Sequence, residues 1–402
     1  MLRSLFAGIS GLRAHQTMLD VTGNNIANVN TTGFKSSSVQ FQDTLSQVLT
    51  NAGAATETAG GTNPAQIGLG VKVAGISTNF QQGASQLTNV STDMMISGDG
   101  FFVVSNGGEQ LYTRSGAFSF DSLGRLVTAD GSFVQGWAAD ATGTVDTNDA
   151  LSDLTLPVNT LMGATATTEA VFSGNLPSDA EVGDTYTRQI DVYDASGGTH
   201  TLTLQFVNTA TGDWDITADV DGTTASGTGS ISFNTDGSID TVTLPTLAAD
   251  AAVGTEAITL NLDDLTGYAE LETIAASDQD GQAAGNLQSF AVNADGTIMG
   301  TFSNGLKQAI GQIALASFTN PDGLETTGSS TYAATVNSGD AQVGVAGTGA
   351  RGSLTSGSLE MSNVDLSAEF TNLIVAQRGF QANSRIITTS DSVLEELVNL
   401  KR

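Results

Sequence analysis

The sequence predicts a mixed, mainly β fold in which the domains are nested. The expected parts are a terminal α-helical coiled-coil domain, an inner β domain and an inserted, acidic outer β domain. Three observations lead to this prediction. Apolar residues at both chain ends recur with helical spacing, the region between the ends shows period-two alternation with many turn residues, and acidic residues are concentrated in the middle of the chain.

Both ends of the chain carry an apolar seam whose spacings alternate between three and four residues, which is typical of one face of a helix. The second seam follows a candidate helix cap at Asn363 or Asp365. The two seams are the candidate assembly interface, and their residues are Leu5, Ile9, Leu12, Leu19, Ile26, Leu366, Phe370, Leu373, Phe380, Ile387, Leu394 and Val398.

Neither helix can bury such a seam alone, and an isolated helix pair buries too little area to be stable as a monomer. The sequence leaves two arrangements open. In the first, the helices pair and pack on the β body of the same chain. In the second, they pair and then pack against other copies of the chain.

Gly- and Ala-rich stretches with few bulky apolar residues separate the expected helices from the β body, and such stretches are typical of linkers. The two stretches lie symmetrically about the body, so we expect a nested domain order. The predicted domains are a terminal helical assembly domain at 1–30 plus 362–402, linker segments at 31–70 plus 338–361, an inner β domain at 71–145 plus 281–337, and an inserted outer β domain at 146–280.

The β body is predicted from alternating apolar residues between turn signals. In the middle of the chain, Ile190 and Val192 lead into a Gly-containing turn, and Leu202, Leu204 and Phe206 alternate with polar residues after it. This pattern predicts a β-hairpin. A further half-buried strand is expected at 214–220, where apolar and polar residues also alternate.

The chain has 402 residues and a formal net charge of −29, from 13 basic and 42 acidic residues. Residues 126–306 hold 26 of the acids and one base, Arg188. We expect this segment to be peripheral and well solvated, because its charges repel one another. The same charge disfavours nucleic acid and anionic membrane surfaces as partners, and no apolar run is long enough to predict a membrane span.

The sequence offers few residues for catalysis or metal binding, since it has no cysteine and two histidines, His15 and His200. A calcium-binding loop starting at Asp213 is not predicted, because its fifth position is Thr217 and the pattern requires an acid or amide there. We therefore predict no catalytic residue, no cofactor and no metal site. A remote alternative is an acidic extracellular glycan-binding or hydrolase module, because paired carboxylates are easily found among so many acids.

Several motifs resemble the rod and hook protein family of the bacterial flagellum. The N-terminal motif runs from Asn24 to Lys35, and the family signature residues within it are Asn25, Ala27, Asn28, Thr32, Gly33 and Phe34. The segments 96–102, 112–118, 362–366 and 377–385 are similar to other motifs of that family. One departure is Gly379-Phe380, where family members often have Ala-Tyr, and a glycine inside a helix costs about 1 kcal/mol relative to alanine.

The length and the acidic insert favour the hook branch of this family, with a distal rod or other axial subunit as the alternative. The resemblance implies a structural subunit that polymerises into a short curved helical tube and acts as a universal joint between rod and filament. It implies as partners further copies of the chain, rod, hook-cap and hook–filament junction proteins, and the flagellar export apparatus. It also implies export without a cleaved signal peptide, since the apolar start of the chain is broken at Ser10 and Gly11.

Overall fold

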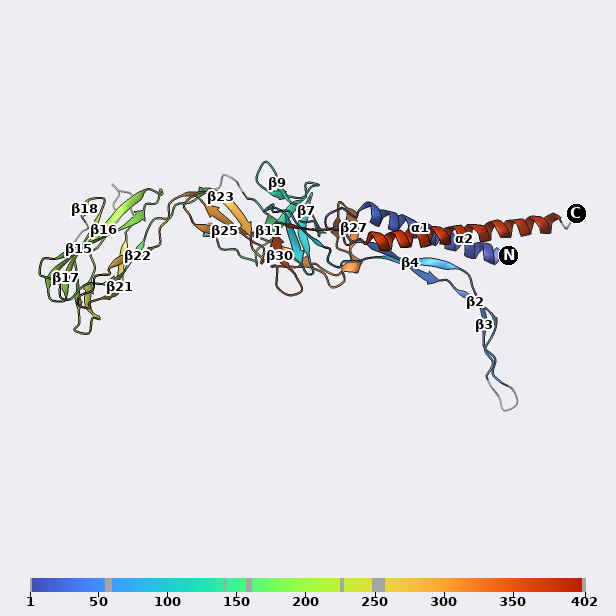
Figure 1. Ribbon diagram of the computed structural model, residues 1–402, viewed down its shortest axis with the longest axis horizontal. Helices are drawn as coiled ribbons and strands as arrows, with labels where there is room; N and C mark the ends of the chain where they lie inside the picture. Colours follow the sequence, from blue (N-terminus) through green and yellow to red (C-terminus); the bar gives the residue numbers. More distant parts are fainter. Residues whose placement is uncertain are drawn as a thin grey trace.

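The computed structural model describes residues 2–54, 60–140, 142–156, 161–224, 228–247 and 257–399 of the chain. The molecule is elongated, and its parts follow one another along the long axis (Figure 1). Two helices and a long β-hairpin form one end, an inner β domain lies in the middle, and an outer β domain forms the other end. The predicted mixed, mainly β fold with terminal helices and a nested domain order is confirmed.

The helical end consists of α1 (Leu2–Ala27) and α2 (Leu366–Asn399), which lie side by side in antiparallel orientation. Gly8 faces Asn383 and Ile387, whereas Asn25 contacts Glu369. Asp365 begins α2 as expected, because its carboxylate accepts the backbone N–H of Ser367 at 2.8 Å. The second helix continues past the N-terminus of the first (Figure 1).

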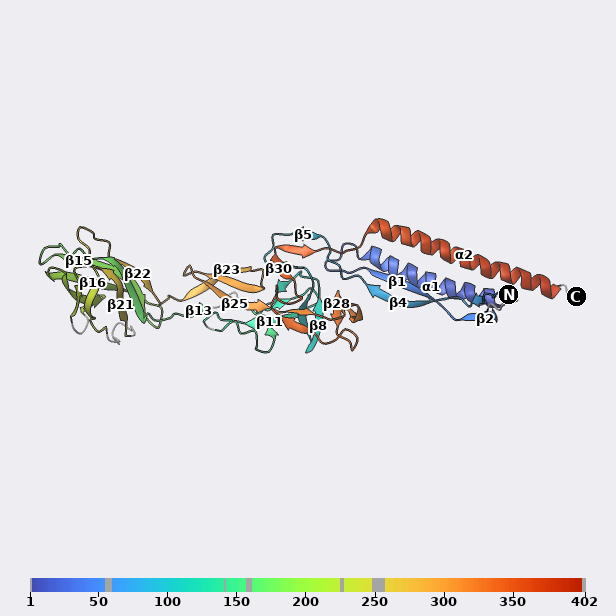
Figure 2. The same cartoon turned by 90° about the horizontal axis from the view of Figure 1, so that it is seen from below.

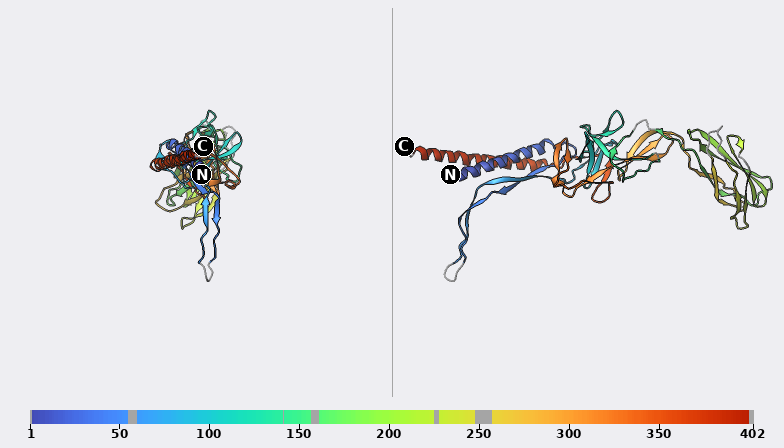
Figure 3. Two further views of the ribbon diagram at one scale, coloured as in Figure 1. Left: turned by 90° about the vertical axis from the view of Figure 1, so that its right-hand side faces the viewer. Right: turned by 180° about the vertical axis from the view of Figure 1, so that it is seen from behind.

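The segment predicted as the first linker forms a long β-hairpin instead. Its strands are β1 (Ser37–Asp43), β2 (Ser46–Thr50), β3 (Ala65–Gly68) and β4 (Val71–Thr78). β1 pairs with β4 and β2 pairs with β3, both antiparallel. The prediction failed because the Gly- and Ala-rich composition holds only for the distal part of this segment, whereas Val39 and Phe41 alternate in β1 and pair with Ile76 and Val73 of β4. Figure 2 shows α1 between α2 and the β1–β4 pair, and Figure 3 shows the β2–β3 tip projecting sideways.

The inner domain is one large antiparallel sheet with short additional strands. Its main path runs β13-β23-β24-β25-β11-β7-β8-β28-β27, so segments from before and after the insert share the sheet. The strands are β5 (Ser85–Leu87), β6 (Met94–Ser97), β7 (Phe101–Asn106), β8 (Glu109–Thr113), β9 (Ser119–Phe120), β10 (Leu126–Val127), β11 (Phe133–Ala138), β12 (Ser152–Asp153), β13 (Leu161–Met162), β23 (Gly285–Val292), β24 (Thr297–Phe302), β25 (Lys307–Ile313), β26 (Leu315–Ser317), β27 (Glu325–Gly328), β28 (Thr331–Ala333), β29 (Gln342–Gly344), β30 (Ser353–Ser356) and β31 (Ser358–Glu360), with a short 3₁₀ helix at Pro321–Gly323.

Strand β7 is the centre of this domain because it is buried on both faces. Phe102 and Val104 belong to the main core, while Phe101 and Val103 pack with Tyr112 on the opposite face. A continuous apolar run is the pattern expected of such a strand.

Three predicted boundaries differ from the structure. The second linker, 338–361, holds strands β29, β30 and β31, and the last two pair with β6 and β5. Residues 71–78 belong to the hairpin and not to the inner domain. Leu154 and Leu156, assigned by sequence to the outer domain, are buried in the inner core. In each case a partner strand distant in the sequence decides where the segment lies.

The outer domain has its own core, which includes Phe172, Phe206 and Trp214. The predicted hairpin is confirmed, since Ile190 lies opposite Leu202 in the pairing of β15 with β16. The strands are β14 (Glu169–Asn175), β15 (Thr185–Tyr193), β16 (Thr199–Ala210), β17 (Asp213–Val220), β18 (Thr223–Thr224), β19 (Gly229–Phe233), β20 (Ile239–Thr243), β21 (Thr259–Thr266) and β22 (Ala275–Gln279).

His200 lies where this hairpin turns, between two carboxylates. Its Nδ1 is 2.6 Å from Asp221 and its Nε2 is 3.5 Å from Asp194. The hydrogen bond with Asp221, and then that with Asp194, raises the pKa of His200 above 6.5. The Ser196 hydroxyl and the Gly198 N–H lower the pKa of Asp194 to about 2.

We predict that the imidazole of His200 titrates above pH 6.5 and stabilises the hairpin turn only while protonated. Because the folded pKa is raised, this stabilisation is fully present below pH 6.5 and is lost as the pH rises through the folded value. An NMR titration of the two histidines, assigned with His200→Asn, measures the midpoint. Asp221→Asn lowers it, and a midpoint at or below 6.5 in the unmodified chain contradicts the assignment.

Candidate assembly interface

The helix pair meets on small and polar residues. On α1 the contact face contains Gly8, Gly11 and Asn25, and on α2 it contains Gly379 and Asn383. A Cβ atom added to Gly11 would lie 2.7 Å from the Asn383 side chain, so any larger residue would displace that side chain. The glycines therefore bring the helices close together, and Ile386 and Ile387 lie against Gly8 in the same contact.

The predicted apolar seam lies beside this contact face, displaced by about one residue along both helices. On α1 the seam residues Leu5, Ile9, Leu12, Leu19 and Ile26 are half-buried. On α2, Leu373, Phe380, Ile387 and Leu394 are half-buried, while Leu366, Phe370 and Val398 are exposed. Phe370 is 52% exposed and Val398 is 70% exposed. In the single chain, the seams are brought to one end of the molecule and are only partly covered.

Further apolar residues are uncovered on the same end. Phe6 on α1 and Ile374 and Val375 on α2 are more than half exposed. The hairpin adds Leu45 and Leu49, at 82% and 53% exposure. A monomer rarely exposes so many large apolar residues in one region, and such a region marks an interaction surface.

His15 explains the unusual glycine in the C-terminal motif. A Cβ atom at Gly379 would lie 2.5 Å from the His15 ring, which also packs edge-on against Phe41 of the hairpin. The ring therefore occupies the space that a side chain at position 379 would take. Gly379 and His15 form a matched pair across the two helices.

The family signature residues form the junction between the helical end and the inner domain. The Asn25 amide donates to the Ser37 carbonyl at 2.8 Å and to Glu369 at 3.1 Å. The Thr32 hydroxyl lies 3.2 Å from that of Ser115, and the Gly33 N–H donates to the Glu360 carbonyl at 2.8 Å. Asn28 closes the turn after α1, bonding to Thr31.

Gly33 has a positive φ of 68°, and a Cβ there would lie 2.5 Å from the Ser115 nitrogen, so the junction requires glycine at this position.

Ala27 ends α1 and is exposed, and Phe34 is half-buried. Asn363, just before α2, donates to the Asn79 carbonyl at 2.7 Å and accepts the Ser36 N–H at 2.8 Å.

A buried ion cluster lies at the centre of this junction. Lys35 Nζ is 2.6 Å from Glu360 Oε1, and Arg114 is 3.5 Å from Glu360 Oε2. Lys35 also donates to the Gln81 carbonyl, and Arg114 donates to the Gly98 carbonyl. Burial lowers the pKa of Lys35 and of Arg114, and the attraction of Glu360 opposes this shift in both. We define these three side chains as the junction triad. The sequence motifs include Lys35 and Arg114 and lie close to Glu360, but they do not indicate that these three side chains are in contact.

Two negative findings limit the chemistry of the described residues. Within them, no group of three or more histidines and acids lies close enough to hold a metal ion. In the same part of the chain, no helix combines the length and the hydropathy needed to cross a membrane.

We predict that Glu360→Gln destabilises the inner domain and its junction by about 3–5 kcal/mol, because it leaves two buried cations without a carboxylate. Denaturant unfolding followed by Trp137 fluorescence in a Trp214→Phe background measures the change, since the chain has two tryptophans. The exposed Glu325→Gln is the matched control. Equal stability of the two variants would contradict a structural role for the triad.

We predict that Gly379→Ala weakens the helix pair although alanine favours helices by about 1 kcal/mol. The new methyl group meets the His15 ring, whereas in a His15→Ala background the same change becomes stabilising. Thermal unfolding of the helices by circular dichroism, applied to the double-mutant cycle, measures the reversal of sign. A stabilising Gly379→Ala in the presence of His15 would show that the ring does not fill this space.

Four parts of the chain match known protein families. Residues 5–35 match the family described as flagella basal body rod protein, and residues 355–400 match the C-terminal region of the flagellar basal body rod FlgEFG proteins. Residues 95–168 match the flagellar hook protein FlgE/F/G D1 domain, and residues 162–282 match the flagellar basal body protein FlaE D2 domain. The matches therefore cover most of both helices, the first part of the inner domain and the outer domain.

Full-length relatives agree with these domains. The chain is 39% identical to the flagellar hook protein FlgE of Borreliella burgdorferi, with both chains covered completely, and 38% identical to that of Salmonella typhimurium, with 99% of this chain and all of the relative covered. It is 34% identical to the basal-body rod protein FlgG of Bacillus subtilis over all of both chains. The crystal structure of the Helicobacter pylori hook protein FlgE2 shares the fold at 14% identity, with a TM-score of 0.54 over 69% of this chain and 99% of that chain. The chain belongs to the flagellar hook protein family.

Proposed function

We propose that this protein is a structural subunit of the flagellar hook, which polymerises through its helical end into a curved tube. The observation that carries the proposal is the pair of apolar seams on α1 and α2, which lie at one end of the molecule and are only partly covered there. A contact between two different surfaces of identical copies builds a helical filament when its rotation does not close into a ring. The relatives named as hook proteins support the same reading.

The shape suggests how such a tube transmits torque. The helical end would form the inner wall, and the acidic outer domain at the opposite end of the long axis would face water (Figure 1). The junction triad and its hydrogen bonds tie the helical end firmly to the inner domain, so torque on one reaches the other. The Ser-, Thr- and Asp-rich surfaces of the β domains provide polar, hydrated contacts between copies, which exchange at lower energy than apolar ones.

The family further supports a set of partners and a location. As a hook subunit, the chain would contact the rod, the hook cap and the hook–filament junction proteins, and it would be exported by the flagellar apparatus without a cleaved signal peptide. We propose an assembly role and no enzymatic one, and an extracellular place in the hook.

We predict that Leu373→Asp prevents polymerisation, because a carboxylate placed in the apolar seam cannot be buried between copies without a partner. Phe370→Asp tests the same seam at a position that is already exposed, where the fold of the monomer does not depend on the ring. Sedimentation and electron microscopy measure polymer formation, and circular dichroism checks that the helices persist.

The matched control is Leu123→Asp, at an exposed leucine of the inner domain. It should assemble into curved tubes like the unmodified chain. Normal tubes from both seam variants would exclude the seam from the interface, and straight tubes from the unmodified chain would favour a rod subunit over a hook subunit.

A further inference from the structure

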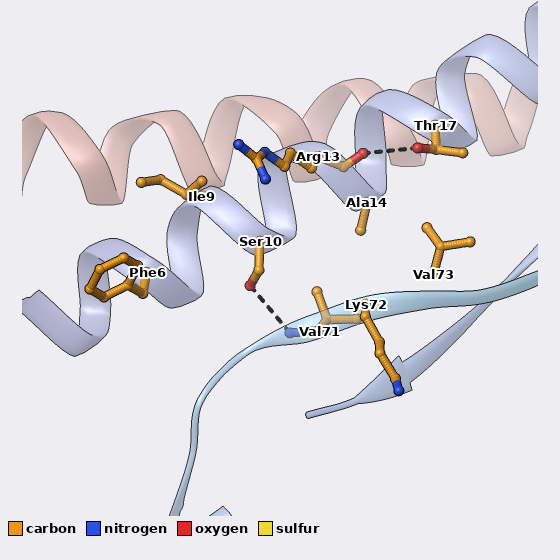
Figure 4. A pocket seen from close by; sticks show the side chains of 9 residues that line it. All are labelled: Phe6, Ile9, Ser10, Arg13, Ala14, Thr17, Val71, Lys72 and Val73. Carbon is orange, nitrogen blue, oxygen red and sulfur yellow. Dashed lines mark hydrogen bonds between the residues drawn. The ribbon is translucent and has the colours of Figure 1, made fainter. Parts of the chain in front are cut away.

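A groove runs between α1 and strand β4, on the side of α1 away from α2 (Figure 4). Its volume is about 390 Å³, and its lining residues are Phe6, Ile9, Ser10, Arg13, Ala14, Thr17, Val71, Lys72 and Val73. The Ser10 hydroxyl accepts the Val71 N–H at 3.3 Å and joins the two walls at the base of the groove. The groove therefore lies between two elements that are hydrogen-bonded to each other, and its lining is largely apolar.

The only charged residues among those lining the groove are basic. Arg13 lies on the α1 side and Lys72 on the β4 side, both are exposed, and their charged ends lie at the outer edges of the groove, with the Lys72 side chain pointing away from α1 (Figure 4). Among the described residues, neither has an ion-pair partner within the chain. In a protein with a net charge of −29, an apolar groove bordered by two such cations fits an occupant that is both apolar and acidic.

One face of the C-terminal end of α2 is both apolar and acidic. Asp391, Leu394, Glu395 and Val398 follow one another at spacings of three, one and three residues, so two carboxylates and two apolar side chains share a face. Both carboxylates and Val398 are exposed. This part of α2 extends past the start of α1, so α1 of the same chain offers it no partner (Figure 1).

The chain cannot place this end in its own groove. Gly379 faces His15, close to the groove residue Thr17, and Val398 lies roughly 30 Å further along the same helix, directed away from the body. A second copy displaced along the long axis can supply the missing helix end, because the overhang projects in that direction.

We propose that the groove between α1 and β4 binds the C-terminal end of α2, residues 391–399, from a second copy of the chain. This inference rests on the proposed assembly function and gives it a specific contact. Leu394 and Val398 occupy the apolar lining, and Asp391 and Glu395 pair with Arg13 and Lys72. The contact joins two different surfaces, so each copy binds one neighbour and is bound by another, which extends the polymer along its axis.

Cysteine cross-linking tests the contact directly, because the chain has no cysteine of its own. Chains carrying Thr17→Cys are mixed with chains carrying Val398→Cys, polymerised and oxidised. We expect covalent dimers of the two variants in the polymer and none in dilute monomer. The matched control replaces Val398→Cys by Glu396→Cys, on the opposite face of the same helix, and should give at least about tenfold less dimer.

Charge reversal gives a second measurement. Arg13→Glu with Lys72→Glu, or Asp391→Lys with Glu395→Lys, should each raise the concentration needed for polymerisation about tenfold or more. A chain carrying all four changes should recover, because the pairs are restored with opposite signs. Circular dichroism of each monomer confirms that the helix pair is intact.

The outcomes separate this inference from the proposed function. If the unmodified chain forms no polymer, the proposed function fails and the contact fails with it. If it polymerises but the Thr17 and Val398 cysteines link no better than the control pair, the groove contact is wrong while the assembly function stands. Polymerisation of both charge-reversed chains at the normal concentration would also overturn the contact.

Discussion

One carboxylate holds the two ends of the chain to the β body. Glu360 comes just before α2, Lys35 comes just after α1, and Arg114 belongs to the inner domain, so the junction triad joins three distant segments. Because all three side chains are buried, removing one charge leaves another without compensation. The attachment of the helical end to the inner domain depends on this connection.

The helix pair combines a stable junction with an apolar surface that the single chain covers only in part. The two helices approach each other at small residues, and several large apolar residues of both helices stay exposed. The intramolecular contact therefore leaves part of the apolar area in water. The exposed part, together with the exposed leucines of the hairpin and the groove beside β4, is the apolar surface that the proposed assembly would bury.

The three parts of the molecule differ in their chemistry. The helical end carries the apolar surface, the inner domain carries the buried β7 strand and the junction, and the acidic outer domain has a separate core. The inner and outer domains have separate cores, so a tilt between these two domains would expose neither core. The His15–Gly379 pair also explains the glycine in the C-terminal motif, because the His15 ring fills the space that a side chain at position 379 would take.

The sequence alone determined the terminal helices, the outer hairpin, the acidic middle and the family, because periodicity, turn residues and short motifs are local properties. It could not determine the hairpin in place of the first linker, since β1 pairs with β4 across a Gly- and Ala-rich stretch that has no pattern of its own. It also could not show which helix face forms the pair, because that depends on Gly11 meeting Asn383. The junction triad and the groove arise only in the tertiary structure, where residues far apart in the sequence become neighbours.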